Sequence, residues 1–407
     1  MSGPNFLPYG RHVIDEADVA AVSAVLRGDW LTTGPVVEAM EAALASRLAV
    51  EHVVACNSGT AALHLALAAA GVGPGDAAIV PSLTFAATAN AARFVGAEVM
   101  FTDVDPETGL MAPEHLKDAL SRAGSSKLRV VLPVHLGGHI ADLPALRTVA
   151  ENHGLAVVED ACHALGGAYG RGNRQAPIGA CADSLAACFS FHPVKTVAMG
   201  EGGAVTTNDR SLAERMRRLR SHAIDREPEH FQCPELAMDG AAVNPWYYEV
   251  AEIGWNYRAS DINCALGLSQ LAKLDSFLAK RRRFADLYDA LLMPLAPIVR
   301  SVPRPPEQIG GWHLYRVLID FPAAGVSRGD LMRRLHAKGI GSQVHYIPVH
   351  RLPYYRNRYG EMNLPGADAY YARCLSLPLY PTLTEADIAR VVETLAEALG
   401  LQSRAAN

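Results

Sequence analysis

Lys195 and Asp160 are the two residues whose types and positions say most about chemistry. Lys195 follows the apolar run Ala186–Phe191 and precedes the glycine-rich turn Gly200–Gly203, while Asp160 directly follows the apolar run Leu155–Glu159. A carboxylate at the end of one strand and a lysine just past another are what pyridoxal phosphate (PLP) requires. The lysine forms a Schiff base with the cofactor, and the carboxylate keeps the pyridine nitrogen protonated. A lone lysine is more often a surface residue, so the interpretation depends on its surroundings.

Four further positions suit the same cofactor. The segment Asn57–Thr60 precedes a helical pattern, and free backbone N–H groups at a helix start favour an anion such as a phosphate. Ser190, close before Lys195, offers a second phosphate donor. Phe85 could stack on the pyridine ring, and His163, one helical turn after the aspartate, could bond its phenolic oxygen. Each position alone also has an ordinary explanation as a helix cap, a strand residue or a core side chain.

The elements that must position these residues alternate between about residues 53 and 208. Predicted strands are Val53–Cys56, Ala78–Val80, Glu98–Phe101, Arg129–Leu132 and Leu155–Val158, and predicted helices are Ala61–Ala70, Ala86–Val95, Pro113–Ala123 and Leu143–Asn152. This βαβ rhythm predicts an α/β fold with a mainly parallel sheet covered by helices on both faces. Ligands bind at the carboxyl ends of strands in such sheets, and both Asp160 and Lys195 fall there.

The chain length of 407 residues predicts two domains. We expect a large PLP-binding domain over residues 1–265, a connecting helix over 266–292 and a small C-terminal α+β domain over 293–407. The helical pattern around the connection runs from about Asp261 to Leu292. The small domain is predicted to contain strands Leu314–Ile319 and Ser342–Tyr346 and helices Arg328–Lys338 and Glu385–Leu399.

Composition argues against several classes of function. The net charge is −5 and no basic stripe stands out, so nucleic-acid binding is not expected. Seven scattered cysteines without a CxxC pair indicate a reducing compartment rather than disulfides. No apolar signal core or membrane-length apolar stretch occurs, so we expect a soluble cytoplasmic protein. His135 and His139 sit with glycines and no metal motif completes them, and no Gly-x-Ser-x-Gly elbow indicates a hydrolase.

Several motifs, in order, resemble those of the DegT/DnrJ/EryC1/StrS sugar aminotransferases. They are Asn57–His64, Glu159–Ala164, Ser190–Thr196, Gly200–Gly203 and Gly254–Asp261. The resemblance spans nearly the whole chain. It implies the aspartate-aminotransferase-like fold type I, a homodimer with composite active sites, and transfer of an amino group to a nucleotide-linked keto sugar. The expected amino donor is L-glutamate, which leaves as 2-oxoglutarate.

The resemblance also implies roles for individual residues. Lys195 takes the place of the Schiff-base lysine, Asp160 that of the pyridinium partner, and His163 that of a family Gln or His near the ring. The positions of the family's phosphate contacts are occupied by Gly59, Thr60 and Ser190. Asn256 corresponds to an asparagine that reaches the phosphate from the other subunit. Family members that dehydrate sugars carry His in place of the lysine, so Lys195 argues against that branch.

A narrower resemblance points to the branch that acts in pseudaminic acid biosynthesis. It lies in Pro245–Glu249, Gly267–Leu271, His345–His350 and Pro353–Arg356. Members of this branch aminate C4 of UDP-2-acetamido-2,6-dideoxy-β-L-arabino-hex-4-ulose. Flat aromatic faces with hydrogen-bonding edges suit a uracil ring and sugar hydroxyls. The expected substrate contacts are Trp246, Tyr247, Tyr248, His345, Tyr346 and His350. The chain departs from the usual pattern at Cys162, Met199 and Ala223.

Two alternatives stay open on the sequence. One is the same chemistry on another nucleotide sugar, such as a D-xylo 4-keto or a 3-keto sugar carried by UDP or dTDP. The other is a PLP-binding regulatory or dehydratase-like homologue without transaminase turnover. Conversion of L-glutamate to 2-oxoglutarate in the presence of a keto sugar would separate the two.

Overall fold

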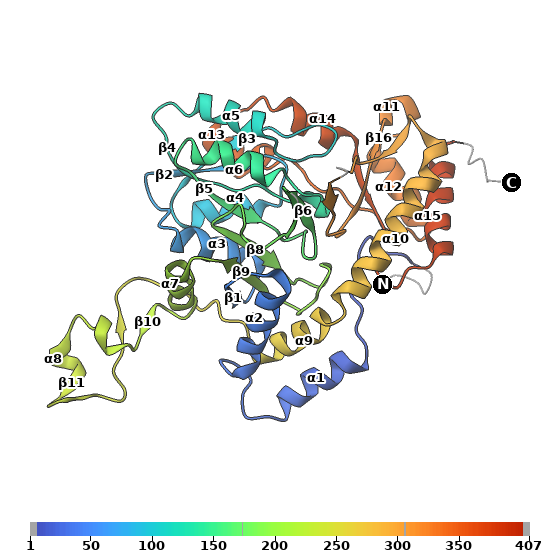
Figure 1. The fold of residues 1–407 in the computed structure, drawn as a ribbon. Coiled ribbons are helices and arrows are strands. Elements are labelled where there is room, and N and C mark those ends of the chain that lie inside the picture. Colours follow the sequence, from blue (N-terminus) through green and yellow to red (C-terminus); the bar gives the residue numbers. More distant parts are fainter. Residues whose placement is uncertain (1–5, 173, 305–306, 402–407) are drawn as a thin grey trace.

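The computed structural model describes residues 6–172, 174–304 and 307–401, and its centre is a seven-stranded sheet (Figure 1). The strand order is β1-β9-β8-β5-β4-β2-β3. These strands are β1 (His52–Cys56), β2 (Asp76–Pro81), β3 (Glu98–Thr102), β4 (Lys127–Val131), β5 (Ala156–Asp160), β8 (Ala186–Ser190) and β9 (Gly203–Thr207). Neighbours from β8 to β3 pair in parallel, and only β9 runs antiparallel to both of its neighbours. The predicted mainly parallel α/β fold is confirmed.

The strands of this sheet are short apolar runs because helices cover both of its faces. Every residue of β2 and β9 is buried, as expected for strands without a solvent-facing side. The covering helices are α2 (Pro35–Leu48), α3 (Gly59–Ala69), α4 (Ala86–Phe94), α5 (Pro113–Arg122), α6 (Leu143–Glu151) and α7 (Arg210–Arg220). Helix α3 begins where Ser58 caps it, because the Ser58 hydroxyl accepts the Ala61 N–H at 3.1 Å.

A smaller antiparallel sheet lies in the C-terminal part of the chain. Its strands, in the order β14-β16-β17, are β14 (Val299–Ser301), β16 (Tyr315–Ile319) and β17 (Cys374–Leu377). It packs with α10 (Leu274–Leu292), α12 (Arg328–Ala337) and α15 (Glu385–Ala398) around a separate apolar core. In that core the rings of Tyr288 and Tyr315 stack with centroids 4.4 Å apart.

One prediction for this region holds in part and another is wrong. The residues from Asp261 to Leu292 are helical as predicted, except for a break at Ala272 and Lys273 that divides them into α9 (Asp261–Leu271) and α10. The predicted strand Ser342–Tyr346 is not a strand, because only Gln343 makes a bridge, to Ser376 of β17. Further elements are α1 (Glu16–Leu26), β6 (Ala168–Arg171), β7 (Arg174–Pro177), β15 (Gln308–Ile309), α11 (Phe321–Ala324), α13 (Pro353–Tyr359) and α14 (Pro365–Arg373).

One segment projects away from the body of the molecule, and we call residues 224–250 the arm (Figure 1). The arm consists of β10 (Ile224–Asp225), α8 (Pro234–Ala237), β11 (Met238–Asp239), β12 (Ala242–Val243) and β13 (Glu249–Val250) with their connections. Large apolar side chains are exposed along it: Leu236, Met238, Trp246, Tyr248 and Val250. Across the described part of the chain, no helix combines the length and apolar character needed to cross a membrane.

Candidate active site

A cavity of about 550 Å³ opens where β5 and β8 end, and it brings together most of the predicted site residues. Asp160 is the last residue of β5, Ser190 is the last of β8, and Lys195 follows five positions later. The predicted residues that line the cavity are Gly59, Thr60, Phe85, Asp160, His163, Ser190, Lys195, His345 and Tyr346. The strand-end position therefore does place the aspartate and the lysine in one site.

The Asp160 carboxylate is held in a fixed orientation by two donors. Its Oδ2 accepts a 2.6 Å hydrogen bond from the Thr88 hydroxyl, and its Oδ1 accepts the Cys162 backbone N–H at 3.2 Å. Asp160 is buried, and so is Thr88, which stands on α4. A buried carboxylate with two donors and no cation paired to it in the described residues is ready to bind a positively charged partner.

Lys195 lies within the same cavity, on the irregular segment after β8. Burial lowers the pKa of its amine below the ordinary value, and the negative charge of Asp160 opposes that shift. A lowered pKa increases the neutral fraction of the amine, which is the form that attacks a carbonyl carbon or takes up a proton. No hydrogen-bond partner of the Lys195 amine is found among the described residues.

The start of α3 forms another wall of the cavity, and its backbone approaches the end of β8 closely. A Cβ on Gly59 would lie 2.7 Å from the Ser190 Cβ and 3.3 Å from the Cys162 Sγ. Glycine is therefore required for this close approach. The backbone N–H groups of Gly59 and Thr60 have no acceptor among the described residues. They are the first two of α3 and lie at the positive end of its helix dipole. This wall suits an anionic group of the size of a phosphate.

His163 and Phe85, the two residues predicted to contact the cofactor ring, differ in burial and in partners. His163 is buried, and its Nε2 lies 3.1 Å from the Tyr346 hydroxyl. Burial, together with the positive charge of Lys195, holds the pKa of His163 well below its ordinary value, so the imidazole is neutral. Phe85 stands at the cavity wall with 59% of its surface exposed, and its ring centroid is 5.9 Å from that of Tyr346.

Other predicted residues do not line this cavity. His350 is buried elsewhere, with its Nδ1 2.6 Å from the Ser82 hydroxyl. Asn256 is exposed, and its backbone carbonyl accepts a hydrogen bond from the Asn57 side chain. Trp246, with 74% of its surface exposed, stands on the arm. Its neighbours Tyr247 and Tyr248 also lie on the arm.

The site also contains residues that sequence reasoning missed. Tyr9 and His313 line the cavity, and Thr88 contributes through its hydrogen bond to Asp160. Thr88, Tyr9 and His313 had no motif to mark them, although Thr88 follows Phe85 by one turn of α4. Tyr9 comes from the N-terminal segment, which crosses to the C-terminal part of the chain where the Leu7 N–H donates to the Gly339 carbonyl at 2.8 Å. Contacts between distant segments leave no periodic signal in a sequence.

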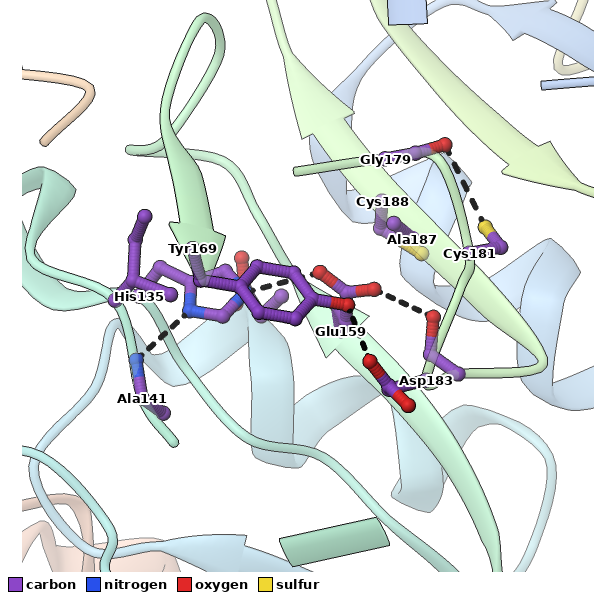
Figure 2. A network of polar contacts seen from close by, with 12 residues as sticks. His135, Ala141, Glu159, Tyr169, Gly179, Cys181, Asp183, Ala187 and Cys188 are labelled. Carbon is purple, nitrogen blue, oxygen red and sulfur yellow. Dashed lines mark hydrogen bonds and ion pairs between the residues drawn. The ribbon is translucent and has the colours of Figure 1, made fainter. Parts of the chain in front are cut away.

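Behind the cavity, a buried polar network fixes the loop that follows β4 (Figure 2). The Glu159 carboxylate lies 3.0 Å from the His135 Nε2 and also accepts a bond from the Ser184 hydroxyl. The other ring nitrogen of His135 accepts the Ala141 N–H at 3.2 Å. Because the His135 N–H donates to the Asp160 carbonyl at 3.1 Å, this network also holds the end of β5 in place.

Comparison with known proteins identifies the family. The family model described as the DegT/DnrJ/EryC1/StrS aminotransferase family matches residues 12–396. The chain belongs to this family. The spore coat polysaccharide biosynthesis protein SpsC of Bacillus subtilis (strain 168) is 38% identical over 394 residues, which cover 96% of each protein. The chain is therefore a sugar aminotransferase of the DegT family.

Solved structures agree with this assignment. Helicobacter pylori PseC, an aminotransferase involved in the biosynthesis of pseudoaminic acid, superposes with a TM-score of 0.85 at 27% identity, covering 97% of this chain and 99% of PseC. Spr1654 of Streptococcus pneumoniae in its PLP form gives a TM-score of 0.85 at 28% identity, covering 97% and 99%. The family depends on PLP, so PLP is the cofactor of this chain.

The residues present fit that cofactor. The Asp160 carboxylate suits a protonated pyridine nitrogen, the free N–H groups at the start of α3 suit a phosphate, and the Lys195 amine suits an aldehyde carbon. The close approach at Gly59, which a Cβ would fill, is the observation that supports the phosphate position.

Proposed function

We propose that this protein transfers the amino group of L-glutamate to C4 of UDP-2-acetamido-2,6-dideoxy-β-L-arabino-hex-4-ulose, a step in pseudaminic acid biosynthesis. The observation that carries the proposal is the position of the segment His345–Ile347, which lines the same cavity as Lys195 and Asp160. This segment belongs to the part of the sequence that resembles the pseudaminic acid branch. The likeness to PseC supports the same branch.

PLP supplies the electron sink that makes the transfer of an amino group possible. The residues of the chain bind the cofactor, orient it and move protons. Asp160 keeps the pyridine nitrogen protonated, because its two hydrogen bonds fix the carboxylate. The Lys195 amine holds the cofactor between turnovers and then moves a proton to and from the substrate carbon, for which its lowered pKa suits it. Thr60 and Ser190 bind the phosphate.

We further propose that each active site is shared between two copies of the chain. Asn256 and Trp246 lie outside the cavity of their own chain, yet Asn256 belongs to a family motif and Trp246 to a motif of the pseudaminic acid branch. The exposed apolar side chains of the arm require a covering surface, since a monomer rarely leaves such a patch in water. In a dimer, Asn256 reaches the partner's phosphate, and the arm brings the three aromatic residues 246–248 to the partner's sugar nucleotide.

A comparison of epimeric substrates tests the substrate proposal. The holoenzyme is given L-glutamate with either the β-L-arabino or the D-xylo UDP-4-keto sugar, and kcat/KM is measured for each, with products identified by mass spectrometry and NMR. We expect a clear preference for the β-L-arabino sugar, because a site that bonds particular hydroxyls leaves buried polar groups unpaired with the wrong epimer. An equal or higher kcat/KM for the D-xylo sugar contradicts the substrate and favours a D-configured one.

A further inference from the structure

Both ring nitrogens of His163 already have partners within the protein. Its Nδ1 accepts the backbone N–H of Gly137 at 3.1 Å, and its Nε2 lies 3.1 Å from the Tyr346 hydroxyl oxygen. A nitrogen that accepts from a backbone N–H carries no proton. The single proton of the neutral imidazole is therefore on Nε2, and it is donated to Tyr346.

The position of the Gly137 N–H is itself fixed. Gly137 has φ 68°, a left-handed conformation, and a Cβ there would collide with the Arg316 side chain, so only glycine fits. The Gly137 carbonyl accepts the Leu314 N–H at 3.1 Å. Two residues earlier, His135 is tied to the buried Glu159 (Figure 2). The tautomer of His163 thus follows from a rigid backbone donor.

This arrangement determines what the Tyr346 hydroxyl can do. Its oxygen accepts the His163 proton, so its own proton remains to be donated elsewhere. No acceptor for it occurs among the described residues, and Tyr346 lines the cavity with Lys195 and Asp160. Burial raises the pKa of Tyr346, so the hydroxyl keeps its proton.

We propose that Tyr346 donates a hydrogen bond to an oxygen atom of the ligand in this cavity, and that His163 is the positioning residue that turns the hydroxyl toward it. The inference rests on the proposed function for the identity of the ligand. The acceptor is the phenolic oxygen of the cofactor or the keto oxygen of the sugar, which share the same chemistry. His163 then makes no bond of its own to either oxygen.

Two similar substitutions of His163 separate this role from simple packing. In His163→Gln the amide oxygen accepts the Gly137 N–H and the amide nitrogen donates to Tyr346, so the relay is kept. In His163→Glu both oxygens are acceptors, so the Tyr346 proton is drawn back toward residue 163 and away from the cavity. Tyr346→Phe removes the donor with little change in shape.

The experiment measures kcat of the holoenzymes with L-glutamate and keto sugar, each half-reaction by itself, and the absorbance spectrum of the bound cofactor. We expect Tyr346→Phe and His163→Glu to lower kcat by about 10- to 100-fold, the loss of one strong hydrogen bond. His163→Gln should stay within about threefold of the wild type, and the double variant His163→Glu/Tyr346→Phe should be no slower than the slower single variant.

The readouts also identify the acceptor. If it is the cofactor oxygen, the absorbance spectrum changes in Tyr346→Phe and His163→Glu but not in His163→Gln. If it is the sugar oxygen, the spectrum and the L-glutamate half-reaction are unchanged and only the sugar half-reaction slows. The inference is overturned if Tyr346→Phe turns over like the wild type, or if His163→Gln loses as much as His163→Glu. A wild type that binds PLP but does not react with L-glutamate instead contradicts the proposed function.

Discussion

The substitution Gly59→Ala should weaken PLP binding while leaving the chain folded. The added Cβ would lie 2.7 Å from the Ser190 Cβ and 3.1 Å from its hydroxyl oxygen, whereas ordinary contacts begin at 3.4 Å. The end of β8 must then retreat from the start of α3 by more than half an ångström. These are the two walls that we assign to the phosphate.

The expected size follows from the cost of overpacking a close contact, about 1–3 kcal/mol. If that cost falls on the bound conformation, the Kd for PLP rises by about 5- to 150-fold. The assay is a titration of the apoprotein with PLP followed by absorbance, with the melting temperature of the apoprotein measured in parallel. Gly28→Ala is the matched control, because its added Cβ meets nothing closer than 3.5 Å. A Gly59→Ala protein that binds PLP as tightly as Gly28→Ala would refute the phosphate position.

Three further predictions concern other parts of the molecule. Thr88→Val removes the 2.6 Å hydrogen bond to the Asp160 carboxylate and should weaken PLP binding by about 10- to 100-fold in the same titration. Mixing Lys195→Ala with a PLP-deficient Asn256→Ala should restore activity, because one heterodimer site then carries both lesions and the other none. Burial lowers the pKa of His64 to about 4 in the folded protein, whereas in the unfolded chain this histidine is protonated below a pH of about 6.5. The free energy of unfolding should therefore decrease as the pH falls from about 6.5 toward 4.

Each of these predictions has its own control. Thr84→Val loses only a bond to Thr88 and none to Asp160, so its PLP affinity should stay within about threefold of the wild type. No return of activity, once subunit exchange is demonstrated, would argue against the cross-subunit role of Asn256. For His64, melting temperatures against pH should fall less steeply in His64→Phe than in the wild type. Parallel curves would mean that this histidine does not cause the acid sensitivity.

The sequence predicted the strands β1 to β5 of the large sheet because the signal of each is local, whereas β9 was not predicted. Runs such as Ala156–Val158 are apolar, short and followed by polar residues, and the strand-end rule then places Asp160 and Lys195 together. The division between α9 and α10 had no such signal, since Ala272 and Lys273 are both good helix formers and the apolar pattern continues through them.

The site could be predicted only in part, because contacts between segments far apart in the sequence determine the rest of it. Residues 342–346 have a β-like composition, but the neighbouring strands offer them a partner only at Ser376, so no strand forms. His350 belongs to the same motif as Tyr346, yet its ring nitrogen is engaged by Ser82 and it faces away from the cavity. Thr88 bonds Asp160 across 72 residues, a separation over which single-sequence patterns carry no information.

The most direct test of the central claim is to locate the cofactor on the chain. The holoenzyme is treated with sodium borohydride, which makes the bond between PLP and a lysine permanent, and its peptides are then examined by mass spectrometry. We predict that the label is found on Lys195 of the wild type. The Lys195→Ala protein should carry no label and should lack the visible absorbance of the bound cofactor. A label on another lysine, or full transaminase turnover by Lys195→Ala without added amines, would contradict the account.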